Sequence, residues 1–325
     1  MIMDYESITS IKDKAEKNLH ALSKTVLDGL KPPAGPYGFF HHSAHSLERL
    51  QDCHRIMKRL FAGRARITEL LRQQNTIMPR DWPAGKPYPE EVQKVMRQED
   101  EVNAYMKQDL ETLYMFGGIL LDQLSLQAIA IANFNLPKKH PFVELVGFFE
   151  SGQTSILDTI WDQLKEKILW LHYQLRFYRN RFVVHANRPW QRGTTRSVYG
   201  DDFNLFTPTP PGWLDDEKLN SEIKNLLNLA PDHIKNAPDD YWEKERPRAL
   251  IERIFNNIGN ISDKKDREKV ASIYGQVGGS TPTFQIIATK LFELVELETD
   301  LLNNIAKTNL QTINLGKPHR SGSQI

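Results

Sequence analysis

Apolar residues recur at three- and four-residue spacing over four long stretches of this chain, and this pattern limits the possible folds more than any other feature. The stretches run from Ser46 to Gln73, from Glu91 to Phe134, from Phe142 or Ser155 to Val184, and from Thr283 to Lys307. Such spacing places apolar side chains on one face of an α-helix, and no convincing run alternates as a strand would. We therefore predict an all-α fold, a bundle of about four long helices.

The remaining segments suggest additions to the bundle. Glu6 to Leu30 predicts a helix that two prolines end, and shorter helices are predicted near Asp216–Leu229 and Tyr241–Ile258. We expect one domain of 325 residues. Its expected parts are an N-terminal helix and loop over 1–45, the first three long helices over 46–187, an insertion with short helices over 188–280, a closing helix over 281–310 and a flexible tail over 311–325.

Composition excludes several classes of protein. The single cysteine, Cys53, excludes an intramolecular disulfide and fits a reducing cytoplasm. The most apolar stretch, Met115 to Leu136, is interrupted by Asp122 and two glutamines, so we expect no membrane span. The motifs of nucleotide hydrolases, zinc proteases, serine hydrolases and dinucleotide-binding folds are missing. The formal net charge is +1, so any binding of nucleic acid must use a local patch.

One such patch lies between Lys167 and Gly200, which carries seven positive charges and no Asp or Glu. Arginines can bind phosphate and aromatic rings can stack on bases, so the segment predicts an RNA site. The aromatic residues are Trp170, Tyr173, Phe177, Tyr178, Phe182, Trp190 and Tyr199. The residues expected to bind nucleic acid are Arg176, Arg181, Arg188, Arg192, Arg196 and Trp190.

Within this segment, Arg179 and Asn180 are followed by four residues and His185, at the end of a long predicted helix. This pattern resembles the HEPN superfamily (higher eukaryotes and prokaryotes nucleotide-binding domain), whose signature is an Arg, usually a polar residue next, and a His shortly after. The resemblance covers Ser46 to Lys307, with Asn187 to Gly279 as a long insertion.

The resemblance implies a metal-independent endoribonuclease without a cofactor, whose two protomers join two motifs in one site. His185 would move the proton, since its ordinary pKa of about 6.5 suits a base or an acid. Arg179 would bind phosphate oxygens with its fork of donors, and Asn180 would orient the histidine or the phosphate. Proteins of this kind commonly act as toxins or against phages, which implies a similar setting.

Several alternatives stay open. On an unbroken helix, residues six apart are separated by about 120°, so Arg179 and His185 converge only if the helix ends or across a dimer. Arg181 and His185, four apart, form a rival pair. The Asp122 carboxylate either pairs with Arg179 or Arg181 and holds that side chain at the site, or it lies at the edge of the helix face and reaches solvent.

One family feature, a group of histidines and an alternative function bear on partners and ligands. The branch paired with nucleotidyltransferase antitoxins has a Tyr two positions after the His, where this chain has Asn187. His41, His42, His45 and His54 lack the spacing of zinc ligands, so we expect exposed loop histidines and no metal site. The rival to a nuclease is a non-catalytic helical scaffold whose basic helix end binds an acidic protein or nucleic acid.

Overall fold

The computed structural model describes residues 4–29, 37–78, 86–132, 140–152, 155–178, 194–196, 203–205, 217–232, 247–277 and 284–309. Within these residues the protein is all-α, as the apolar spacing predicts, apart from one small hairpin. Its buried apolar side chains form one hydrophobic cluster that draws on all the long helices.

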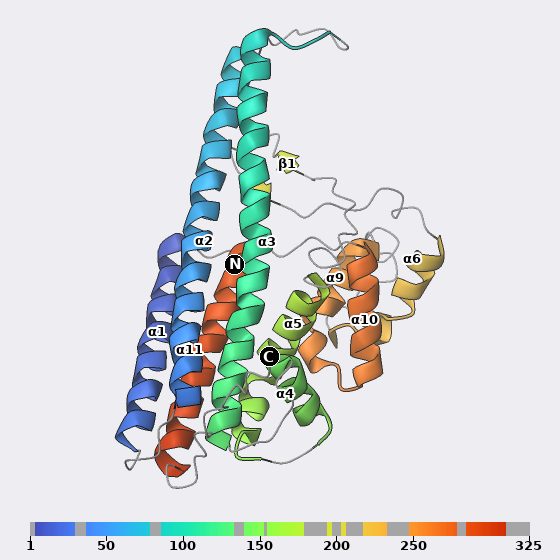
Figure 1. The fold of residues 1–325 in the computed structure, drawn as a ribbon. Coiled ribbons are helices and arrows are strands. Elements are labelled where there is room, and N and C mark those ends of the chain that lie inside the picture. The colour runs from blue at the N-terminus through green and yellow to red at the C-terminus, as the bar shows by residue number, and fades with distance from the viewer. Residues whose placement is uncertain are drawn as a thin grey trace, which may run out of the picture.

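Four long helices lie side by side: α1 (Tyr5–Asp28), α2 (Tyr37–Ile77), α3 (Glu90–Ala132) and α11 (Phe284–Asn309). Phe61 of α2 packs edge to face against both Tyr5 and Phe284, so α1 and α11 begin at the same level. Asn18 of α1 then donates to the backbone carbonyl of Glu296 further along α11, which shows that the two helices run in the same direction. The longer pair α2 and α3 extends well beyond them (Figure 1).

The third predicted helix is two helices, α4 (Pro141–Glu150) and α5 (Asp158–Tyr178). Gly152, at φ 71°, forms the turn after α4, a conformation that glycine adopts without strain. Ser155 and Asp158 then start α5, because the Ser155 hydroxyl accepts from the Leu157 N–H and the Asp158 carboxylate accepts from the Ser155 N–H. Of the two predicted starts, the one at Ser155 is close to the structure.

A group of shorter helices packs beside α5: α6 (Glu217–Lys224), η2 (Leu227–Leu229), α9 (Pro247–Asn256), η3 (Ile258–Asn260) and α10 (Lys264–Val277). The first three lie where short helices are predicted, and η3 begins at the last residue of the second predicted helix. The apolar spacing does not predict α10, since few of its residues are apolar. Its start has a readable signal, because the Asp263 side chain accepts from the backbone N–H groups of Lys265 and Asp266.

A buried ion pair joins α10 to α4. Arg267, 4% exposed in its side chain, donates to Glu150, whose side chain is 7% exposed, over 2.5 Å. The guanidinium also donates to the backbone carbonyls of Ile261 and Ser262. Lys264 binds the same carboxylate at 3.0 Å from a more exposed position. α10 is therefore tied to α4 by charge.

Two short strands, β1 (Thr194–Arg196) and β2 (Phe203–Leu205), pair antiparallel with Thr195 opposite Asn204. This small hairpin is an addition to the all-α fold that the sequence analysis does not predict. A run of three residues is too short for alternation to be visible. The second strand contacts α2.

Other predicted bounds differ by a few residues, with one larger error. α2 begins at Tyr37, nine positions before the predicted Ser46, and its first turns contain His41, His42 and His45. The prediction of a histidine-bearing loop is therefore wrong. Phe39, 1% exposed, anchors this early start to the core. The expected division into domain parts stays a prediction.

Candidate functional site

The second half of α5 is enclosed on every side. All eight residues from Ile168 to Leu175 are buried, although a surface helix would expose one face. Trp170 and Tyr173 are 2% and 5% exposed, so neither ring can stack on an RNA base. The prediction that aromatic rings of the basic segment stack on RNA bases is therefore wrong for Trp170 and Tyr173. The apolar contacts that bury them hold the helix in one position.

Polar contacts and one glycine hold the end of α5 against its neighbours. Gln174 donates to the hydroxyl of Tyr114 in α3 over 3.1 Å. A Cβ added to Gly117 of α3 would lie 3.2 Å from Leu291 of α11 and 3.9 Å from Leu175 of α5, so the glycine lets both helices approach α3 closely. These contacts lie one to two turns before Arg179. The chain therefore enters the motif from a fixed helix.

Two positive charges near this end of α5 are already engaged. Lys167, the first cation of the basic segment, binds Glu293 of α11 at 2.5 Å. Lys290 of α11 lies over the ring of Trp170 at 4.7 Å, and the indole N–H of Trp170 donates to Asn256 over 3.4 Å. Burial, followed by the charge of Lys167, lowers the pKa of Lys290. Both lysines thus stabilise the packing of α5 on α11.

The predicted motif and most of its basic neighbours lie outside the described residues. They are Arg179, Asn180, His185, Arg181, Arg188, Trp190 and Arg192. Only the backbone is described for two others, Arg176 in the last turn of α5 and Arg196 in β1. Which of these side chains come together stays a prediction, including the choice between Arg179 and Arg181 as the partner of His185.

Asp122 is half-buried on α3 and has a role that neither predicted alternative includes. Its carboxylate accepts from the backbone N–H of Phe142 over 3.1 Å, in the first turn of α4. A negative charge there stabilises a helix start, because the first N–H groups have no partner within the helix. Asp122 therefore attaches α4 to α3. Its predicted support of an arginine stays a prediction.

A basic surface that the sequence analysis missed lies on α2. Between Cys53 and Ile77 six Lys or Arg residues accompany one acid, Glu69. Four of them share one side of the helix at the rotation of 3.6 residues per turn. This α2 basic face consists of Arg55, Lys58, Arg59 and Arg66, all exposed. The local imbalance of charge was the signal that could have found it.

Ion pairs partly balance the α2 basic face. Arg55 binds Asp52 at 3.1 Å, Arg59 binds Asp109 of α3 at 2.5 Å, and Arg66 binds Glu69 at 2.7 Å. The side chains of the three arginines are 67%, 57% and 43% exposed in that order. The pair between Arg66 and Glu69 is exposed on both sides, and such pairs contribute about 0–1 kcal/mol, so it can be exchanged for contacts to phosphate. Asp52 and Asp109 are more buried, and Asp109 accepts three hydrogen bonds from Arg59.

No metal site is found among the described residues. His42 pairs its Nδ1 with the side-chain oxygen of Gln123 at 2.7 Å, and His54 lies within hydrogen-bonding distance of Thr9 at 3.2 Å. Burial lowers the pKa of His54, which favours the neutral ring. Cys53 is buried, and burial raises the pKa of its thiol. It is not placed to act as a nucleophile.

No protein-family model, curated protein or solved structure matches this chain. By length and composition α3 could cross a membrane, and half of its most apolar window is buried inside the protein. Core helices of soluble proteins have the same properties, so the finding is weak evidence for a membrane span.

Proposed function

We propose that this protein acts on RNA as a HEPN-like, metal-independent endoribonuclease, with Arg179, Asn180 and His185 at its site. The observation that carries the proposal is that the motif follows α5 directly in the sequence, with Arg179 four residues after Leu175, the last residue of the buried run. A catalytic group must be held within a fraction of an ångström of its working position. A helix enclosed on all sides and bonded to Tyr114 meets that need better than a free surface helix does.

The reaction that fits these residues breaks the bond between phosphorus and the 5′-oxygen of the next nucleotide. His185 takes the proton of a 2′-hydroxyl, whose oxygen attacks phosphorus and forms a cyclic phosphate. Arg179 neutralises the charge that grows on the phosphate oxygens. A second His185, from the other protomer of a dimer, returns a proton to the leaving oxygen. The proposal therefore includes a homodimer. It also includes a location in the cytoplasm, which the single cysteine favours.

A cleavage assay in EDTA tests the proposal directly. Wild-type protein and His185→Ala are incubated with RNA of mixed sequence, and the products are examined for 2′,3′-cyclic phosphate ends. We expect cleavage by the wild type alone. If the RNA stays intact with both proteins, at concentrations where both bind it, the proposed nuclease activity is wrong. Light scattering at high micromolar concentration tests the dimer separately, and a monomer there would contradict it.

The second candidate is a scaffold that binds RNA without cutting it. The α2 basic face favours this candidate, because exposed arginines and lysines bind the phosphate backbone of any sequence. Binding in the absence of cleavage would support it. A lack of both would remove the two RNA functions together.

A further inference from the structure

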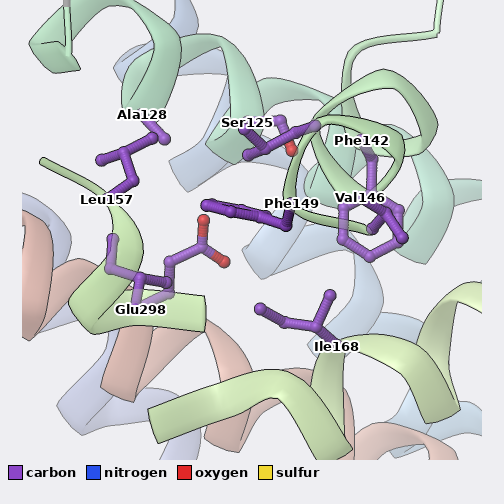
Figure 2. Close-up of a pocket in the computed structure, with 10 residues that line it drawn as sticks. Ser125, Ala128, Phe142, Val146, Phe149, Leu157, Ile168 and Glu298 are labelled. Atoms are coloured by element: carbon purple, nitrogen blue, oxygen red, sulfur yellow. The ribbon is translucent and has the colours of Figure 1, made fainter. Parts of the chain in front are cut away.

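A carboxyl group lies in the core of the protein where no opposite charge faces it. Glu298 of α11 is 4% exposed, and its side chain points into a small cavity among α3, α4, α5 and α11 (Figure 2). Eight of the ten residues that line the cavity are apolar. Ser125 of α3 carries the other polar side chain in the lining. The described residues give the Glu298 carboxyl no ion pair and no hydrogen bond.

Among the residues that line the cavity, Glu298 is the only titratable one. Two titratable groups contact the lining residue Phe142 from outside the cavity: His172 of α5, whose ring centroid lies 6.0 Å from that of Phe142, and Asp122 of α3, which accepts from the Phe142 N–H. On the other side of α11, α1 brings the neutral side chain of Asn18 to the backbone carbonyl of Glu296. The cavity is lined by Ala128 and Ser125 from α3, by four apolar residues of α4, by Leu157 ahead of α5, and by two isoleucines of α5. On α11 itself the residues one turn away are Leu294, Val295, Leu301 and Leu302. An ionised carboxylate would therefore lack both a counter-charge and a hydration shell.

Burial is the only cause that acts on this group, and it raises the pKa of Glu298 to about 7 from the ordinary 4.5. The folded protein thus holds this proton about 300-fold more tightly than an exposed glutamate does. At pH 6 the carboxyl is mostly neutral, and at pH 8 it is mostly ionised. The change falls within the range that cells and common buffers cover.

The cavity is too small to hydrate the ionised form. The space open to the centre of a water molecule is about 10 Å³, which is room for about one water. More water can enter only if one wall moves. α4, with ten residues, is the shortest of the helices that line the cavity. It contributes four of the lining side chains, Phe142, Leu145, Val146 and Phe149. Asp122 holds its first turn and Arg267 holds Glu150 at its last residue, so water would enter through a local loosening between these two anchors.

We propose that Glu298 is an internal proton-binding site that controls how α4 packs: with the proton bound α4 closes the cavity, and after its release α4 loosens and admits water. The inference does not depend on the proposed RNA function. It links pH to the helix that precedes α5 along the chain.

The sign of the effect follows from the raised pKa. An open form of α4 would return Glu298 to water and to its ordinary pKa, so the open form gains from a rise in pH. From the two pKa values, opening becomes about 25-fold more favourable between pH 5.5 and pH 8, and most of the change occurs below pH 7. Above pH 7 the effect levels off, because both forms are then ionised.

Hydrogen exchange measures this opening. The exchange of the α4 amides, residues 141–150, is followed at pH 5.5, 7 and 8 and corrected for intrinsic rates, in the wild type, in Glu298→Gln and in Asp300→Asn. The amide introduced by Glu298→Gln would imitate the neutral acid, so we expect the pH dependence of α4 to disappear in that variant. The control Asp300→Asn removes an exposed carboxylate from the same helix and should behave as the wild type. Carbon-13 NMR of the glutamate carboxyls should show one group that titrates near pH 7 in the wild type.

Either of two results would overturn the proposal: α4 protection in the wild type that stays constant from pH 5.5 to pH 8, or glutamate carboxyls that all titrate below pH 6. Both are measured on the wild-type protein. The proposal is therefore decided even if Glu298→Gln fails to fold.

Discussion

Gln174 in α5 donates a hydrogen bond to the hydroxyl of Tyr114 in α3 over 3.1 Å, and both side chains are buried. Arg179 follows Gln174 by five residues. The bond therefore fixes the rotation of α5 about its own axis just before the motif, which apolar contacts alone would fix less strictly. Buried hydrogen bonds give a helix interface a specific register because an unpaired polar group there is costly.

Tyr114→Phe should destabilise the protein, since it leaves the side-chain N–H of Gln174 without its acceptor in the core. We expect a loss of about 1–3 kcal/mol in the free energy of unfolding, measured with urea. Tyr105→Phe is the matched control on the same helix. Tyr105 is 61% exposed, so its change should have almost no effect. Equal effects of the two variants would show that the buried bond contributes nothing.

Gly259→Ala should also be destabilising, for a steric reason. η3 approaches α5 so closely that an added Cβ would lie 2.5 Å from the Cα of Glu166. Backbone cannot move aside as a flexible side chain can, and we expect a loss of about 1–3 kcal/mol or more. Gly147→Ala provides the contrast, because no atom lies within 4 Å of its added Cβ and alanine favours a helix. Thermal unfolding should show a lower Tm for the first variant and an equal or higher Tm for the second.

The two cations on Glu150 should differ in what they contribute. Arg267→Met leaves a buried carboxylate short of its main partner, and breaking a buried pair costs about 3–5 kcal/mol. Lys264→Met removes a cation that is 54% exposed, which should cost less than about 1 kcal/mol. Comparable losses in urea unfolding would mean that burial does not decide the strength of this pair.

The same pair predicts a pH dependence. Burial alone would raise the pKa of Glu150, but hydrogen bonds from Lys264 and Arg267 outweigh it and hold the pKa below its usual 4.5. A lowered pKa in the folded state gives stability above pH 4.5 that is lost as the pH falls below that value. The difference in stability between wild type and Arg267→Met should therefore shrink on acidification below pH 4.5. A constant difference from pH 7 to pH 3 would contradict this account.

The sequence predicted the long helices well because their apolar spacing is regular over many turns. The predicted end of the second long stretch, Phe134, lies two residues from the end of α3 at Ala132. The early start of α2 was missed because Gly38 and the histidines around position 42 hide the apolar pattern, although Phe39 is in the core. α10 was missed because its charged residues outnumber its apolar ones. α10 is stabilised by the ion pair between its Arg267 and Glu150 of α4, and these two residues are far apart in the sequence.

The functional residues were less accessible to sequence reasoning. Spacing could suggest Arg179 and His185 as a pair, but it could not tell which rings of the basic segment face solvent. Trp170 and Tyr173 belong to the core, and that depends on how α9, α10 and α11 enclose α5. Glu298 looked like any surface acid of an amphipathic helix. Only the three-dimensional packing of α3, α4 and α5 around it makes it a buried group.

The α2 basic face should bind RNA through its charges. Changing Arg55, Lys58 and Arg66 to Gln together should weaken RNA binding similarly for all sequences. It should also reduce the slope of log K against log salt by about 2, since each phosphate contact on a single strand contributes about 0.7. The control changes three exposed lysines of α1, Lys14, Lys17 and Lys24, to Gln, which alters the net charge equally. Equal losses in both triple variants would assign binding to net charge rather than to this face.

The last prediction separates proton transfer from phosphate binding in the motif. His185→Ala should lose about 10²–10⁴-fold in the cleavage rate, which is the usual contribution of general acid–base catalysis. It should lose little RNA affinity, because a neutral imidazole adds little to phosphate binding. Arg179→Ala should lose both rate and affinity, since a guanidinium binds the phosphate before the reaction and more strongly at the transition state. Single-turnover cleavage and filter binding on the same RNA measure the two quantities.

If Arg181→Ala instead of Arg179→Ala lowers the cleavage rate at unchanged dimerisation, the catalytic pair is Arg181 and His185, four residues apart. A loss of affinity in His185→Ala as large as its loss of rate would mean that the histidine binds RNA and transfers no proton.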